Sequence, residues 1–96
     1  MRVRVIDEER LFGRGDVHRG DRVVLPRVLY RLTVCRYGSV YGKVRAPKLQ
    51  GLTDLLHRAD DWLQLRLADG RVVFFQLRRA ESRLGGWGEV EGRLSP

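Results

Sequence analysis

The stretch of sequence that decides the fold is WLQLRLADGRVVFFQLRRA, residues 62–80. Apolar and polar side chains alternate on both sides of Asp69-Gly70, and a period of two is typical of half-buried strands. Asp-Gly is a favoured two-residue hairpin turn, because both positions tolerate a positive φ. The stretch therefore predicts a hairpin. Its core face would hold three cross-strand pairs: Leu67 with Val72, Leu65 with Phe74, and Leu63 with Gln76.

The opposite face of this hairpin is too apolar for bare surface and too polar for a core. It would pair Arg66 with Val73, Gln64 with Phe75, and Trp62 with Leu77. If these side chains are exposed together, they form an apolar patch of the size that indicates a protein partner. If the helix or the last strand covers them, they are structural. The candidate protein-interface residues are Trp62, Phe75, Leu77, Trp87 and Phe12.

Residues 28–46 predict a second hairpin, which turns around Gly38. A slip of one residue moves a whole strand face from core to solvent, so the burial pattern selects the register. A three-residue loop, Tyr37-Gly38-Ser39, gathers the apolar residues on one face, whereas an even-numbered loop mixes them with charged residues. We therefore expect the odd loop. The inward set is then Val28, Tyr30, Leu32, Val34, Val40, Val44 and Ala46.

The remaining segments are a strand at residues 1–7, a short extended piece at residues 23–25 and a closing strand at residues 87–94. Pro26 confines the short piece to an edge or a bend. Residues 8–22 are polar and contain three glycines, which predicts a long loop, and such loops are often functional.

One short helix is expected between the two hairpins. Its apolar residues follow the spacing of a single helix face, with Thr53 or Gly51 as the N-cap. Asp60 and Asp61 disfavour a helix C-terminus, so the helix should end near Ala59. The apolar face comprises Leu52, Leu55, Leu56 and Ala59.

This order of elements predicts a mainly β protein. We expect a small antiparallel barrel, OB-like or SH3-like, of about six strands, with one short helix inserted between two hairpins. OB barrels place a helix between their third and fourth strands. The likeness rests on the order of elements and on no sequence motif. Ninety-six residues allow one such domain, spanning residues 1–96.

The charge of the chain indicates a polyanionic partner. Of its 19 basic residues, 17 are arginines, and the net charge is +7 with a pI near 10.7. Arginine pairs bidentately with phosphate or carboxylate and stacks on flat rings. Nucleic acid and acidic protein surfaces are therefore the expected partners. A purely compositional excess of arginine is the alternative explanation.

Enzyme activity is not expected. Cys35 and His57 form the only conceivable nucleophile–base pair, and two histidines with one cysteine lack the spacing of a zinc site. No cofactor is expected. No window approaches the ~18 apolar residues of a membrane span, so no membrane partner is expected. A single cysteine favours the cytoplasm, or a particle assembled there.

The best candidate site is the outward face of the hairpin at residues 28–46. Cations there would follow phosphates, and a tyrosine ring would stack on a base of a single-stranded nucleic acid. An ordinary solvated sheet face is the alternative. The predicted polyanion-binding residues are Arg31, Thr33, Tyr41, Lys43 and Arg45 on this face, with Arg14 and Arg19 in the loop.

A second function fits the same features. The chain would be a structural subunit of a larger particle, such as a phage capsid, connector or tail, or would form a homo-oligomer. The loop at residues 8–22 would insert into a neighbouring subunit, and the arginines would pair with acidic residues there. The mass of the protein in solution distinguishes this function from nucleic-acid binding.

Overall fold

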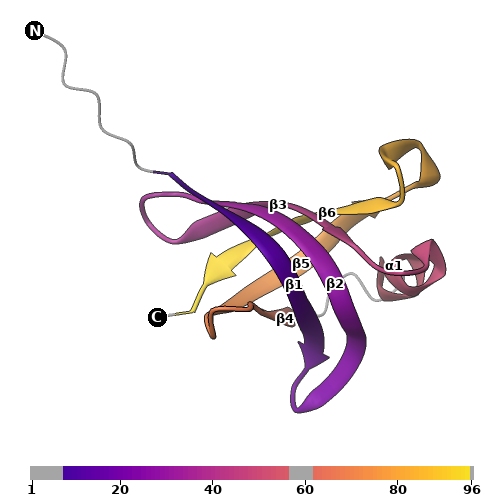
Figure 1. The fold of residues 1–96 in the computed structure, drawn as a ribbon, viewed down its shortest axis with the longest axis horizontal. Coiled ribbons are helices and arrows are strands. Elements are labelled where there is room, and N and C mark those ends of the chain that lie inside the picture. The colour runs from indigo at the N-terminus through magenta and orange to yellow at the C-terminus, as the bar shows by residue number, and fades with distance from the viewer. Residues whose placement is uncertain (1–7, 57–61, 96) are drawn as a thin grey trace, which may run out of the picture.

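Six strands close into an antiparallel barrel that carries one short helix, as the sequence predicts (Figure 1). The computed structural model describes residues 8–56 and 62–95. The strands are β1 (Glu9–Arg19), β2 (Arg22–Val34), β3 (Ser39–Arg45), β4 (Leu63–Arg66), β5 (Val72–Ala80) and β6 (Trp87–Leu94). The helix is α1 (Leu49–Leu56), and a short 3-10 turn, η1 (Ser82–Leu84), precedes β6.

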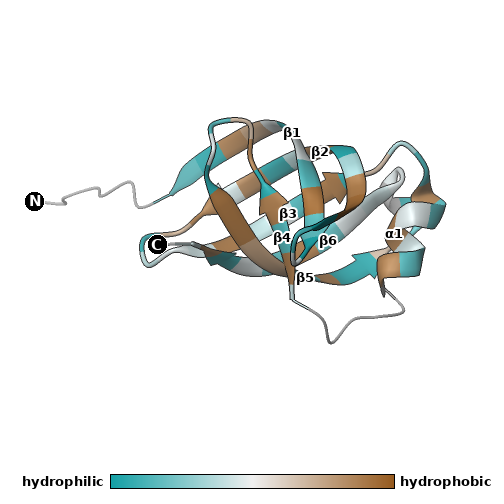
Figure 2. Cartoon of the chain, turned by 90° about the horizontal axis from the view of Figure 1, so that it is seen from below, coloured by the Kyte–Doolittle hydropathy of each residue, from teal (hydrophilic) through white to brown (hydrophobic). Residues whose placement is uncertain are grey.

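Two three-stranded meanders build the barrel. Strands β1, β2 and β3 form the first, and β4, β5 and β6 form the second. The meanders join where β3 pairs with β6 and where β1 pairs with β4. Helix α1 lies between them in the chain and sits at one end of the barrel, with the end of β6 at the other (Figure 1, Figure 2). The helix thus falls between the third and fourth strands, as expected.

The β2–β3 hairpin buries the face that its alternation predicts. Val34 pairs with Val40 and Tyr30 with Val44, and the whole predicted inward set is buried. The loop has the predicted three residues but starts at Arg36, one position early. Gly38 closes it with φ 85°, and its N–H donates to the Cys35 carbonyl at 2.9 Å. Because the loop still has an odd number of residues, the side chains predicted to point inward remain on the inner face.

The predicted register of the β4–β5 hairpin is wrong by one residue. Its loop has three residues, and Gly70 takes the left-handed third position with φ 92°. The Gly70 N–H donates to the Leu67 carbonyl at 3.0 Å. The slip reverses the faces of β5. The buried residues are Val73, Phe75 and Leu77, whereas Val72, Phe74 and Gln76, predicted for the core, are half-buried or exposed.

Residues 8–22 form strand β1 and the turn after it, and not the predicted loop. Strand β1 runs from Glu9 to Arg19 and turns tightly through residues 20 and 21 into β2. Gly13 and Gly15 occupy inward positions, where close neighbours exclude a side chain. A Cβ atom on Gly13 would lie 2.5 Å from the Tyr30 hydroxyl oxygen, and one on Gly15 would overlap the Arg66 carbonyl. These glycines permit close packing of strands, although in sequence they resemble loop glycines.

Strand β2 includes the predicted short piece at residues 23–25 and continues past Pro26. The register of β1 against β2 shifts between Gly15 and Val17, which marks a bulge. Pro26 lies on β2 opposite this irregularity, where the missing N–H is tolerated. The sequence correctly predicts a bend here, but the strand does not end.

Helix α1 begins at Leu49, so neither Gly51 nor Thr53 is its N-cap. The Thr53 hydroxyl instead donates to the Gln50 carbonyl at 2.9 Å inside the helix. Leu52 and Leu55 are buried, as predicted. The predicted strand at residues 1–7 and the predicted helix end near Ala59 lie outside the described residues.

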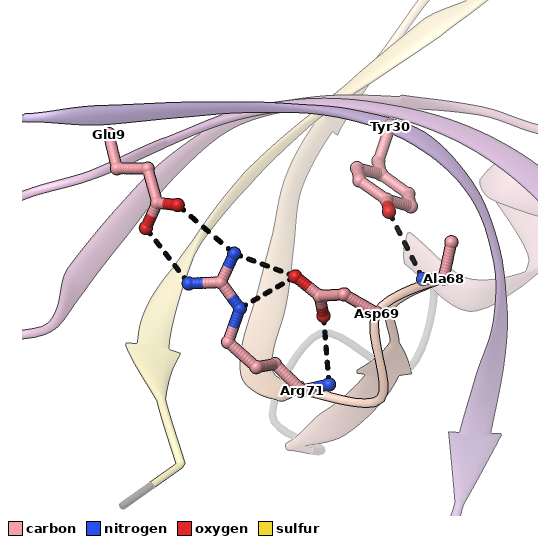
Figure 3. Close-up of polar contacts among 5 residues, drawn as sticks. All are labelled: Glu9, Tyr30, Ala68, Asp69 and Arg71. Carbon is pink, nitrogen blue, oxygen red and sulfur yellow. Dashed lines mark hydrogen bonds and ion pairs between the residues drawn. The ribbon is translucent and has the colours of Figure 1, made fainter.

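Two polar contacts connect the β4–β5 turn to the first meander (Figure 3). Arg71 bridges Glu9 at 2.8 Å and Asp69 at 2.7 Å. Hydrogen bonds from Arg71 lower the pKa of both carboxyl groups. The Tyr30 hydroxyl accepts the Ala68 N–H at 3.1 Å, which gives this buried phenol a partner.

The corrected register can be tested with adjacent phenylalanines. Phe75 is 1% exposed and Phe74 is 37% exposed. Phe75→Ala should lower the free energy of unfolding by about 3–5 kcal/mol, because it leaves a cavity in the core. Phe74→Ala should cost less than about 1.5 kcal/mol. Urea unfolding of both variants measures the difference, and equal losses would contradict the register.

The Arg71 bridge predicts a dependence of stability on pH. The folded-state pKa values of Glu9 and Asp69 lie below the ordinary 4.5 and 3.8, so their stabilisation is complete above those values. It is lost as the pH falls through the lowered folded values. Thermal melts between pH 6 and pH 2 should therefore fall less steeply for Arg71→Gln than for the parent. Arg66→Gln is the control, and parallel curves for parent and Arg71→Gln would refute the bridge.

Candidate functional site

The outward face of β2 and β3 carries the predicted cations and tyrosine. Arg31 lies opposite Lys43, and Thr33 lies opposite Tyr41. Arg45 lies opposite Leu29 in the next row. Arg31, Tyr41, Lys43 and Arg45 are exposed, and Thr33 is half-buried. The structure therefore brings together the five residues that the alternation of this hairpin selected.

Strand β1 extends this face with three further side chains. Phe12 lies opposite Arg31, Arg14 opposite Leu29 and Arg10 opposite Thr33. All three β1 side chains are exposed. The sequence placed Phe12 and Arg14 in a loop, and Arg10 was missed. The alternation Arg10, Phe12, Arg14 was the available signal, but the glycines at positions 13 and 15 concealed it.

Arg19, the other predicted loop cation, does not join this face. It lies at the far end of β1, where its backbone pairs with that of Arg22 beside the two-residue turn.

We call the outward side chains of β1, β2 and β3 that are exposed or half-buried the outer face. Its members are Arg10, Phe12, Arg14, Leu29, Arg31, Thr33, Tyr41, Lys43 and Arg45.

Aromatic rings on and beside the outer face surround one of its cations. The Arg31 guanidinium carbon lies 5.7 Å from the centroid of the Phe12 ring and 5.9 Å from that of the Trp87 ring. Phe12 is 64% exposed, Tyr41 is 49% exposed and Trp87 is half-buried. Phe12, Arg31 and Trp87, together with Leu29, line a shallow hollow of about 440 Å³. A flat ring can enter such a hollow against aromatic and guanidinium faces.

Negative charge borders the outer face on one side. On β6, Glu89 lies opposite Lys43 and Glu91 lies opposite Tyr41. Glu91 is also 3.3 Å from Arg78 of β5. The positive potential is therefore offset along β6 and least opposed toward β1 and β2. An anion on the outer face is therefore repelled least on the side away from β6.

Several arginines elsewhere on the barrel contact carboxylates. Arg79 and Arg83 both contact Glu81, at 3.1 and 3.0 Å, and these contacts lower the pKa of Glu81. In the part of the chain that the structure describes, no carboxylate lies within ion-pair distance of Arg14, Arg31 or Arg45. The arginines thus fall into two groups: some contact a carboxylate, and others, including those of the outer face, have no carboxylate partner among the described residues.

The predicted protein-interface patch does not form as expected. Phe75 and Leu77 lie in the core, because the β5 register is shifted by one residue. Trp62, 57% exposed, instead lies beside a hollow of about 580 Å³ that Phe74, Arg78 and Arg93 also line. Trp87 and Phe12 lie beside each other at Arg31, away from this hollow.

Searches against protein-family models, curated proteins and solved structures found no match to this chain.

His57 of the candidate catalytic pair lies outside the described residues. Cys35 is a free, half-buried cysteine at the β2–β3 turn. Over residues 8–56 and 62–95, no group of three or more histidine, cysteine, aspartate or glutamate side chains is arranged to hold a metal ion. Within the same ranges, no helix has the length and apolar composition that a membrane crossing requires.

The exposed rings of the outer face should contribute little to folding. Phe12→Ala and Tyr41→Ala should each change the free energy of unfolding by less than about 1 kcal/mol, because both rings are largely in solvent. Leu32→Ala, on the buried side of the same sheet, should cost about 2–5 kcal/mol. Denaturant unfolding measures all three. A large loss at Phe12 or Tyr41 would give that ring a structural role.

Proposed function

We propose that the protein is a non-catalytic module that binds single-stranded nucleic acid across its outer face. The observation that carries the proposal is the combination of exposed Phe12 and Tyr41 rings with Arg31 between their strands. Bases stack on aromatic rings in any sequence, and cations beside them follow the phosphates. Stacking of this kind needs unpaired bases, so a single strand fits better than a duplex.

The spacing of the rings supports contacts with separate bases. Phe12 and Tyr41 lie on strands that are two spacings apart, and Tyr41 is one outward position further along. With about 4.8 Å between strands and about 3.4 Å per residue, the two positions are roughly 12 Å apart. Side chains that project in parallel from positions this far apart present two separate stacking surfaces. The two aromatic residues would therefore engage different nucleotides of an extended strand.

The alternative function, a subunit of a larger particle, was based on a long insertion loop at residues 8–22. Most of that segment is paired within the barrel wall, and only the turn at residues 20 and 21 remains for insertion. The hollow beside Trp62 and Phe74 is the surface left for a subunit contact. The particle subunit therefore has less support than nucleic-acid binding, because the insertion loop on which it was based is mostly strand.

Binding of a short fluorescent oligonucleotide, followed by anisotropy at several salt concentrations, tests the proposed function. The slope of log K against log salt is about −0.7 per phosphate contacted on a single strand. Arg31→Ala and Arg45→Ala should each reduce the slope by about one contact. Tyr41→Ala and Phe12→Ala should weaken binding by ~1–3 kcal/mol and leave the slope unchanged, because stacking releases no counterions.

Arg79→Ala is the matched control, because it removes the same charge from an arginine already paired with Glu81. Equal losses from every arginine variant would indicate attraction to net charge alone. No binding near physiological salt would refute the proposal. In that case a discrete oligomer in light scattering would support the particle subunit.

A further inference from the structure

A small pocket lies at one end of the outer face. Its volume is about 280 Å³, and three of its six lining residues are arginines. Each arginine comes from a different strand: Arg14 from β1, Arg27 from β2 and Arg45 from β3. The other lining residues are Leu29, Ala46 and Pro47.

The barrel itself brings these arginines together. Arg14 and Arg45 both lie opposite Leu29, one on each side of it in the same cross-strand row. Arg27 precedes Leu29 by two residues on β2. The pocket adjoins the hollow beside Phe12, because both are lined by Arg14 and Leu29. A group that stacks in the hollow and a group that enters the pocket can therefore belong to one ligand.

The backbone at Arg27 is held in an unfavourable conformation. Arg27 has φ 56°, and it alone among the described non-glycine residues has a positive φ. Its N–H donates to Asp16 Oδ1 at 3.0 Å, where the register of β1 and β2 shifts. Glycine would be the favoured residue at such a position, because a Cβ atom is strained there. An arginine at this φ suggests that its side chain has a function.

Among the described residues, no carboxylate forms an ion pair with the arginines of the pocket. No carboxylate lines it, and no ion pair involves Arg14, Arg27 or Arg45 among the residues that the structure describes. Asp16, beside Arg27, uses one oxygen for the Arg27 backbone. Three arginines that line one small pocket concentrate positive charge there, and a bound anion would offset their mutual repulsion.

We propose that this pocket binds a phosphate monoester, namely the terminal phosphate of a nucleic-acid strand whose bases lie on the outer face. A monoester carries nearly two negative charges near neutral pH, whereas an internal diester carries one. Three arginines suit the larger charge, and the planar guanidinium pairs bidentately with phosphate oxygens. The assignment of the phosphate to a nucleic-acid strand rests on the proposed function. Binding of a phosphate group in the pocket does not rest on it, because a mononucleotide or inorganic phosphate offers a similar group.

The test compares one oligonucleotide sequence in three forms, with a 5′-phosphate, with a 3′-phosphate and with hydroxyls at both ends. At physiological salt, one phosphorylated form should bind about tenfold more tightly than the hydroxyl form. Arg27→Gly should abolish this preference. Glycine accepts the left-handed backbone, so the variant should melt at or above the parent temperature. Arg14→Gln provides a second variant at an ordinary strand position.

Arg22→Ala is the matched control, because it removes one charge from the same strand outside the pocket and should preserve the preference. Titration with inorganic pyrophosphate separates this inference from the proposed function. In one outcome the parent binds pyrophosphate but no oligonucleotide, and Arg27→Gly does not bind pyrophosphate. That outcome would support the anion site but overturn its assignment to a strand end. Equal binding of all three oligonucleotides, or a preference that persists in Arg27→Gly, would refute the pocket and leave the proposed function standing.

Discussion

Closure of the barrel depends on a short contact between β1 and β4. Three residues of β1, from Asp16 to His18, pair with three residues of β4. At this place the register between β1 and β2 shifts, so that β1 can bend toward β4 while it remains paired with β2. The same irregularity places Asp16 beside the Arg27 backbone and holds Arg27 in its left-handed conformation. The irregularity that lets the sheet close on itself therefore also positions Arg27, one of the three arginines of the pocket.

The two halves of the surface use arginine differently. On β5 and the turns that flank it, arginines are paired with nearby glutamates or aspartates, and exposed pairs of this kind contribute little to stability. On the outer face, Arg14, Arg31 and Arg45 lie beside aromatic or apolar side chains, and no carboxylate of the described residues is within ion-pair distance of them. Composition alone would not separate the two groups in this way. The distribution is what supports an anionic ligand on the first meander.

Alternation in the sequence predicted the β2–β3 hairpin and the bounds of β6, and the outward set that includes Arg31 and Tyr41 followed from it. Strand β1 was missed because two consecutive inward positions, Gly13 and Gly15, carry no side chain, so that no apolar alternation is visible there. The turn after β4 was misplaced because Asp69-Gly70 suits both a two-residue loop and the last positions of a three-residue loop. The role of Arg27 depends on a backbone angle at a bulge, and no pattern of residue types encodes that angle.

The order in which strands must meet has a consequence for folding. The pairs inside each meander join segments close in sequence, whereas Val17 and Leu65, at the closing contact, are about 50 residues apart. Contacts between distant residues form slowly, because the entropy of closing the intervening chain opposes them. We therefore expect the closing contact, and with it the conformation of Arg27, to form late. A ligand that binds only the closed barrel would stabilise it by mass action, so the occupied protein would open less often than the empty one.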